Sequence, residues 1–294
     1  MVYLLAQLRK PCMSYKIKIY VCPEDGKNSY LQGRAEKIAR DFDLPLYPGK
    51  KQAWDPAVHF LLVVSRGSVY LKPVNQIFSQ LGSKPIYPDW LNMDTSSVAG
   101  RKSSQPVIKA IQGNKKSLRS QVVLDATAGW GEDSWIMASL GFSLISLERS
   151  AIIYLLLRDA YARAGRCFPR TCSRIRLLHM DALDLLYTLN KDKRDKEILL
   201  PKPDAIYLDP MFPEQEKRKS AQKKLTRVLR ILQGEKGADR KEEEELLDLS
   251  LRTAKNRVVV KRPKNGEPYA GGYVSPVHGV KGKGMRFDVY NCKT

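Results

Sequence analysis

The chain has 294 residues, 43% of them hydrophobic and 28% charged, which describes an ordinary globular protein of one large domain or two modest ones. Lys and Arg number 51 against 31 Asp and Glu, and this net charge of +20 points to a polyanionic partner, nucleic acid above all, although a generally basic surface gives the same sum. The five cysteines have neither CxxC nor zinc spacing, and no apolar run approaches the ~18 residues that span a membrane, so we expect no metal, no disulfide framework, no membrane contact and a cytoplasmic location.

The N-terminal third is predicted to form a small α+β domain over residues 13–90. It contains no catalytic constellation, and His59, in an apolar run, is expected to be a packed histidine rather than a base. The expected elements are a strand over 16–21, an amphipathic helix over 29–41, and a β-hairpin whose strands cover 59–64 and 68–71.

Two further stretches flank this domain. Residues 1–12 are treated as an N-terminal extension, because Met13 stands just before the first strand and is a second candidate start. Residues 91–120 are predicted to be a basic connecting segment with a short helix over Val107–Ile111. Such a segment is either a plain solvated linker or lies along RNA.

The stretch from Gln121 to Glu148 predicts a strand, a glycine turn, a helix and a second strand, the first βαβ unit of a nucleotide-binding sheet. Gly129 and Gly131 allow a close backbone approach to a ligand after Asp125, and Glu148 ends the second strand, where it can accept both ribose hydroxyls. Because Ser134 replaces the third glycine of the dinucleotide fingerprint, the pattern favours S-adenosylmethionine over NAD.

The α/β alternation continues to the C-terminus, which predicts a Rossmann-like domain over residues 121–294 with helices on both sheet faces. Asp181 follows a strand, where a carboxylate can accept from the adenine amino group or cap the next helix. The further elements are expected as helices over 150–164 and 182–189, strands over 174–179, 204–208 and 257–261, two polar helices within 214–255, and a closing antiparallel pair over 274–280 and 286–290.

The loop after the fourth strand of this domain carries the chemistry. Its sequence, Tyr207-Leu-Asp-Pro-Met-Phe-Pro213, matches the Asp-Pro-x-aromatic pattern of methyltransferases that act on planar exocyclic amines. Asp209 and the Pro210 carbonyl can accept both amine N–H groups, and Phe212 can stack on an extruded base. The alternative is an ordinary turn at a strand end.

Basic residues follow this loop and recur near the C-terminus. Such a run is usually a solvated helix face, but its position directly beyond the loop favours phosphate binding. The predicted RNA-binding residues are Lys217, Arg218, Lys219, Lys261, Arg262 and Arg286.

At these motifs the chain resembles the RsmJ-type 16S ribosomal RNA (guanine-N2) methyltransferases. The resemblance covers residues 121–294 and includes Leu147-Glu-Arg149, Arg257-Val-Val-Val-Lys-Arg-Pro263 and Arg286-Phe-Asp-Val-Tyr290 beside the glycine turn and the Asp-Pro loop. It implies a class I methyltransferase with S-adenosylmethionine as cofactor and a guanine amine in the helix 45 loop of 16S rRNA, as naked RNA or in the small subunit, as target. The cofactor contacts that it implies are Glu132, Asp133, Glu148, Arg149, Asp181, Ala182 and Asp209.

Three alternatives stay open from the sequence. The same loop suits an adenine N6 amine of RNA or DNA. A non-catalytic RNA-binding assembly factor that retains the fold is a second possibility, although the intact loop argues against it. A dehydrogenase is disfavoured because the third glycine is missing. The oligomeric state is not indicated.

Overall fold

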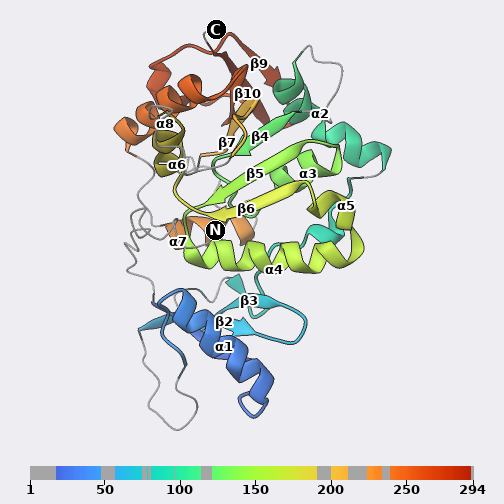
Figure 1. The fold of residues 1–294 in the computed structure, drawn as a ribbon, viewed down its shortest axis with the longest axis vertical. Coiled ribbons are helices and arrows are strands. Elements are labelled where there is room, and N and C mark those ends of the chain that lie inside the picture. Colours follow the sequence, from blue (N-terminus) through green and yellow to red (C-terminus); the bar gives the residue numbers. More distant parts are fainter. Residues whose placement is uncertain are drawn as a thin grey trace.

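The computed structural model describes residues 18–47, 57–74, 78, 81–95, 97–113, 121–190, 200–210, 224–233 and 239–292. It contains a three-stranded and a seven-stranded sheet, the smaller one lying below the larger in Figure 1. The proposed extension and Met13 lie outside the described residues, as do Phe212 and the basic residues 217–219.

The small sheet forms as the sequence predicts. Strand β1 (Lys18–Pro23) pairs in parallel with β2 (Val58–Val64), and β2 pairs antiparallel with β3 (Val69–Pro73), which confirms the hairpin. Helix α1 (Ser29–Asp41) connects the parallel pair, and the Asn28 side chain caps it by accepting a backbone N–H of its first turn.

His59 packs within this sheet. Its Nδ1 accepts a hydrogen bond from the backbone N–H of Lys18 at 3.0 Å, and its ring lies edge-on to Phe78 with centroids 5.7 Å apart. The ring nitrogen is therefore used within the fold, as expected for a packed histidine.

The connecting stretch is more ordered than the sequence suggested. After a 3-10 turn, η3 (Trp90–Asn92), it forms the 15-residue helix α2 (Val98–Gln112), so the predicted helix over Val107–Ile111 was too short. Pro106 interrupts the apparent helical pattern, but α2 packs on β8, β9 and β10 and buries Val107 and Ile111. Tertiary packing outweighs local propensity here.

The seven-stranded sheet has the strand order β6-β5-β4-β7-β8-β10-β9. Its order reverses between β4 and β7, and in such doubly wound sheets ligands bind outside the carboxyl ends of the strands at this switch point. The elements are β4 (Val122–Asp125), α3 (Glu132–Ser139), β5 (Ser143–Glu148), α4 (Ala151–Cys167), α5 (Pro169–Cys172), β6 (Ile175–His179), α6 (Ala182–Asn190), β7 (Ala205–Leu208), α7 (Lys224–Gln233), α8 (Arg240–Thr253), β8 (Arg257–Pro263), η6 (Tyr269–Gly272), β9 (His278–Lys281) and β10 (Met285–Asn291).

The closing antiparallel pair is present, but its first strand is shorter than predicted. Strand β9 begins at His278 rather than near residue 274. The preceding chain makes η6, in which Ala270 has a φ of 52° and Tyr269 is 1% exposed. This left-handed turn packs against α8 and ends at Gly272. Bends at residues 273, 274 and 277 follow it, so the chain becomes a regular strand only at His278.

Helices cover both faces of the large sheet, which confirms the predicted Rossmann-like class (Figure 1). One core contains residues of α2, α3, α4 and α7 and continues into the small sheet. The second core lies on the opposite face, under α6, α8 and η6. Because the first core is continuous, the small sheet packs directly on the large domain. The domain boundaries expected at residues 90 and 120 remain predictions.

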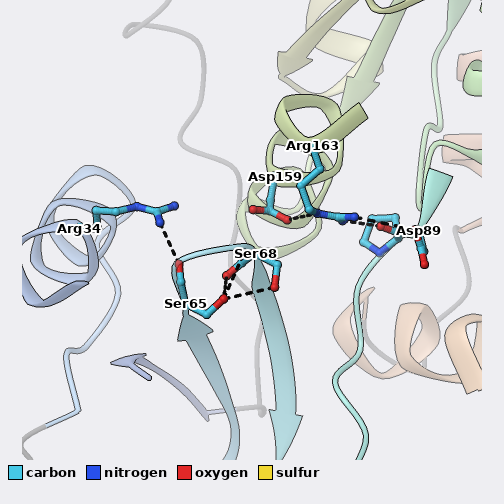
Figure 2. A network of polar contacts seen from close by, with 7 residues as sticks. Arg34, Ser65, Ser68, Asp89, Asp159 and Arg163 are labelled. Carbon is cyan, nitrogen blue, oxygen red and sulfur yellow. Dashed lines mark hydrogen bonds and ion pairs between the residues drawn. The ribbon is translucent and has the colours of Figure 1, made fainter. Parts of the chain in front are cut away.

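Polar contacts on α4 reinforce this packing (Figure 2). The Arg163 guanidinium pairs with Asp159 at 2.7 Å, donates to the Pro88 carbonyl at 2.6 Å and lies 3.9 Å from Asp89. Asp159 also accepts a backbone hydrogen bond from Val69 in β3. One partly buried ion pair thus connects α4 to the small sheet and to the segment that leads into Trp90.

Candidate active site

Four carboxylates follow the parallel strands at one edge of the large sheet. Asp125 ends β4 and Glu148 ends β5, while Asp181 lies two residues after β6 and Asp209 one residue after β7. Because these strands are parallel and adjacent, their carboxyl ends meet. The structure therefore brings together the carboxylates that the sequence assigned to cofactor and substrate.

The glycine turn lies across the end of β5. The Ala128 N–H donates to the Leu147 carbonyl at 3.0 Å, and the Gly129 N–H donates to Glu148 Oε2 at 3.1 Å. Gly129 has a φ of 54°, in the left-handed region that glycine adopts without strain. The turn is thus fixed to the strand that carries the expected ribose acceptor.

Gly131 serves packing as well as conformation. Its φ is 69°, and a Cβ there would lie 2.5 Å from the Trp90 ring and 2.8 Å from Leu157. The Trp90 indole N–H donates to the Trp130 carbonyl at 3.0 Å, and its ring stacks on Trp135. The glycine turn therefore rests on a tryptophan from the segment that follows the small sheet.

Asp125 is buried and satisfied within the fold. The Ser134 hydroxyl donates to its Oδ2 at 2.6 Å, the Thr127 N–H donates to Oδ1 at 3.2 Å, and the Ser146 hydroxyl donates in turn to Ser134. Burial raises the pKa of Asp125 to about 7 against the opposing effect of these hydrogen bonds. Ser134, at the place of the absent third glycine, thus holds the first strand end in place.

Glu148 accepts backbone hydrogen bonds on both oxygens. Oε1 accepts from the Ser150 N–H at 2.7 Å, and Oε2 accepts from Gly129. The residue is 4% exposed, and burial raises its pKa to about 7 although both N–H groups act in the opposite direction. Two preorganised oxygens at a strand end are what the vicinal hydroxyls of a ribose require.

Asp181 both starts α6 and faces a cation. Its Oδ1 accepts from the Leu183 N–H at 2.9 Å, which confirms the capping role. Its Oδ2 lies 3.8 Å from Arg149, whose guanidinium also pairs with Glu242 of α8 at 2.9 Å. Ala182, at the first position of α6, is buried directly beside this carboxylate.

A lysine joins the Asp-Pro loop to α3. Lys261 Nζ lies 2.7 Å from Asp133 Oδ2 and 2.9 Å from Asp209 Oδ2, and the Tyr207 hydroxyl donates to the same Asp133 oxygen at 2.6 Å. The Asp209 backbone N–H donates to Thr127 Oγ1, also at 2.6 Å. The side chain of Asp209 is thereby linked through Lys261 to α3, and its backbone is bound to Thr127 of the glycine turn.

Opposing effects act on the charges of this network. Burial raises the pKa of Asp209, and Lys261 offsets part of that rise. Burial would also raise the pKa of Asp133, but the Lys261 charge and the hydrogen bonds from Lys261 and Tyr207 lower it. The pKa of Lys261 is raised by both carboxylates despite burial. The lysine therefore stays charged between two carboxylates.

The basic residues predicted to bind RNA are not equivalent in the structure. Lys261 lies in the carboxylate network, with its side chain 22% exposed. Arg286 pairs with Asp288 at 2.8 Å and donates to the Gly266 carbonyl, while Arg262 donates to the Glu267 carbonyl at 2.7 Å. These contacts brace the loop after β8, and RNA binding by the three residues remains a prediction.

The edge fits a cationic nucleoside cofactor. It offers carboxylate acceptors for ribose hydroxyls, an amino group and positive charge, and the Gly129 N–H is already bound to a carboxylate instead of being directed at a phosphate. A pyrophosphate would meet the negative charge of Glu148, whereas a sulfonium and an ammonium would not. Within the described ranges, no group of three or more His, Cys, Asp or Glu is arranged to hold a metal ion, and no helix is long and apolar enough to cross a membrane.

A doubly wound sheet with carboxylates after successive strands and an Asp-Pro loop after β7 defines a Rossmann-like class I methyltransferase. The sequence model of the SAM-dependent methyltransferase family matches residues 50–292. The chain therefore belongs to this family, and its cofactor is S-adenosylmethionine. The relatives described next show that it is an RsmJ-type member.

Two relatives and one solved structure give the detail of this similarity. A protein of Thioalkalivibrio sulfidiphilus named ribosomal RNA small subunit methyltransferase J is 36% identical over 279 residues, 94% of this chain and 97% of the relative. A protein of the same name from Coxiella burnetii is 35% identical and covers 88% of this chain and 92% of its own. The crystal structure of a SAM-dependent methyltransferase from Neisseria gonorrhoeae superimposes with a TM-score of 0.64 at 27% identity, covering 92% of this chain and 95% of that one.

Sequence reasoning missed several residues that build the site. Thr127, Trp90 and Tyr207 contact the functional loops but were given no role from the sequence, and Lys261 was assigned to RNA rather than to Asp209. Only Thr127 and Tyr207 had a local signal, since they stand within the two motifs. Trp90 has none, because its partner Trp130 is 40 positions away in the sequence.

Proposed function

We propose that this methyltransferase transfers a methyl group from S-adenosylmethionine to the exocyclic N2 amine of a guanosine in 16S ribosomal RNA, in the helix 45 loop. The family resemblance supports guanosine as the target nucleotide. The relatives named small subunit methyltransferase J support small-subunit ribosomal RNA as the substrate. The net charge of +20 suits a polyanionic substrate. The observation that carries the chemistry is Asp209, held at the end of β7 beside the cofactor edge.

In this mechanism the cofactor would supply an electrophilic methyl group on its sulfonium, with the neutral thioether S-adenosylhomocysteine as the leaving group. Asp209 accepts one amine N–H through Oδ1, the oxygen that does not contact Lys261, and the Pro210 carbonyl accepts the other. Both acceptors orient the nitrogen lone pair, which is otherwise delocalised into the base, toward the methyl group. Positioning supplies most of the acceleration, so no strong base is required.

The remaining roles follow from the loop. Phe212 stacks on the extruded base and holds it in line with the methyl group. After transfer the amine carries an extra proton, which leaves to Asp209 or to water. Glu148 and Asp181 bind the nucleoside part of the cofactor, Ala182 and Arg149 line its base, and Glu132 and Asp133 face its charged end. Asp125 supports the cofactor turn from beneath, through Ser134 and Thr127.

Lys261 acts in this mechanism as a positioning residue. By pairing with Asp209 Oδ2 it offsets part of the rise in the pKa of this carboxylate and fixes which oxygen faces the substrate. Through Asp133 it also connects the orientation of that carboxylate to α3, the helix that begins at the cofactor turn.

The test is transfer of labelled methyl from S-adenosylmethionine into small subunits and naked 16S RNA that lack the modification, with mass spectrometry of the modified nucleoside. N2-methylguanosine in the helix 45 loop is the expected product, and comparison of the two substrates shows which form the enzyme uses. Labelled N6-methyladenosine would keep the enzyme class but overturn the nucleotide. Bound cofactor without label would favour a binding factor.

A further inference from the structure

The carboxyl edge of the large sheet has two halves of opposite charge. Over β6, β5, β4 and β7 it carries the four carboxylates of the cofactor half. Beyond β7 the edge is formed by the end of β8, the start of β10 and the end of β9. That half carries Lys264, Lys281 and Lys283, which we name the lysine tip. Asp209 marks the boundary between the two halves.

Strand register places the lysine tip at the same edge as Asp209. Met285 of β10 lies opposite Pro263 of β8, and Lys281 of β9 lies opposite Arg286. The Lys264 N–H donates to the Gly284 carbonyl at 3.3 Å, which joins the two parts of the tip. Since neighbouring strands are about 4.8 Å apart, the tip begins about 5 Å from the strand that leads to Asp209 and ends about 14 Å from it.

The three lysines differ from the arginines beneath them. All three are exposed, and none of them takes part in an ion pair with another described residue. Arg286 and Arg262, in contrast, are bound to the carbonyls of Gly266 and Glu267. The arginines thus give the tip a rigid base, while the lysines offer charge to a ligand outside the protein.

We propose that the lysine tip binds the phosphate backbone of the RNA beside the target nucleotide, an inference that rests on the proposed function. The acidic half attracts the cationic cofactor and repels a polyanion. The RNA strand is therefore confined to the basic half. Contacts to phosphates fix register without reading sequence. Only the target base then has to cross the boundary at Asp209.

A pair of double variants tests this inference. Lys281→Gln with Lys283→Gln removes two charges from the tip. Lys202→Gln with Lys255→Gln removes two charges from exposed lysines before β7 and β8, at the opposite edge of the sheet. The net charge is the same in both proteins, so general electrostatic attraction is matched, and all four positions are exposed.

The measurements are the affinity for a transcript of the 16S 3′ domain across a salt series, the KM for RNA, and the affinity for S-adenosylmethionine. We expect the tip variant to bind RNA on the order of tenfold more weakly, with a salt slope smaller by about 2 and unchanged cofactor affinity. Equal RNA binding by the two variants would overturn the inference. Absence of RNA binding and methylation in the unmodified protein would instead refute the proposed function.

Discussion

At the scale of single residues, the most informative contact is the one between Lys261 and Asp209. A lysine placed between two carboxylates is costly to bury, and in the proposed mechanism it lies where the substrate amine meets its carboxylate acceptor. The titratable groups that act on Asp209 are Lys261 from β8, Asp133 and Glu132 from α3, Asp125 from β4 and Tyr207 from β7. Among them only Lys261 favours the charged form of Asp209.

Lys261→Met should therefore lower kcat on the order of 100-fold and move the acidic limb of the pH–rate profile to higher pH, because the pKa of Asp209 rises without the lysine charge. Lys261→Arg should restore the pH profile in part. If Lys261 had a purely structural role, both variants would be less stable but their pH–rate profiles would not shift. Thermal unfolding of both variants, with Lys255→Met as control, distinguishes the two roles.

Asp209→Ala should reduce kcat at least as strongly, because it removes the acceptor itself. The affinity for S-adenosylmethionine, measured by calorimetry, should fall less than kcat does. Retention of full methyl transfer in this variant would exclude Asp209 from the reaction and with it the proposed orientation of the amine.

Glu148 gives a prediction for stability. Its pKa is raised to about 7 in the folded protein, so its contribution to stability is present below the unfolded pKa and is lost as pH rises through 7. The cofactor-free protein should lose about 2 to 3 kcal/mol between pH 5 and pH 8 through this group. Urea unfolding of Glu148→Gln should show a pH dependence smaller by that amount, and an identical dependence would contradict the burial effect.

At the scale of elements, the glycine turn depends on packing beneath it as much as on the ligand above it. Gly129 and Gly131 both have positive φ, but a Cβ at Gly129 would come no closer than 3.5 Å to Leu229, whereas at Gly131 it would collide with Trp90. An alanine at Gly129 would thus test backbone strain alone, whereas an alanine at Gly131 would test strain together with a steric clash.

Gly131→Ala should lower the free energy of unfolding by about 2 to 4 kcal/mol, because left-handed strain and overpacking add. Gly129→Ala, the matched control, should cost about 1 kcal/mol, since only the strain applies. Chemical denaturation measures both. Equal losses would show that Trp90 yields easily and does not constrain the turn.

At the scale of the whole molecule, α4 joins the small sheet to the active site. Arg163 and Asp159 are 13% and 10% exposed, and Arg163 also covers the Tyr87 ring at 4.8 Å. The segment that they hold leads directly into Trp90 and so to the cofactor turn. We expect the small sheet to support the site mechanically, through this connection, rather than chemically.

Arg163→Ala should destabilise the protein by about 2 kcal/mol, because it leaves a partly buried carboxylate without its charged hydrogen-bond donor. It should also weaken S-adenosylmethionine binding through Trp90. Arg166→Ala, three residues further along the same helix at an exposed position, should change neither quantity. Lost stability with unchanged cofactor affinity in Arg163→Ala would refute the mechanical link.

Local features of the sequence determined the α/β class, the helix over 29–41, the glycine turn and the Asp-Pro loop. Apolar periodicity and turn residues act over a few positions, so they can be recognised from the sequence without knowledge of the fold. The assignment of Asp125, Glu148, Asp181 and Asp209 to strand ends follows from the same signals, because parallel neighbours share an edge.

Only the tertiary structure decided which side chains support these groups. Lys261 and Asp133 are 128 positions apart, and their pairing depends on strand order rather than on any local pattern. The length of α2 and the place of Trp90 beneath Gly131 depend in the same way on packing between distant segments. The division of the site edge into an acidic and a basic half also arises there, since strand order, and not chain order, sets which charges become neighbours.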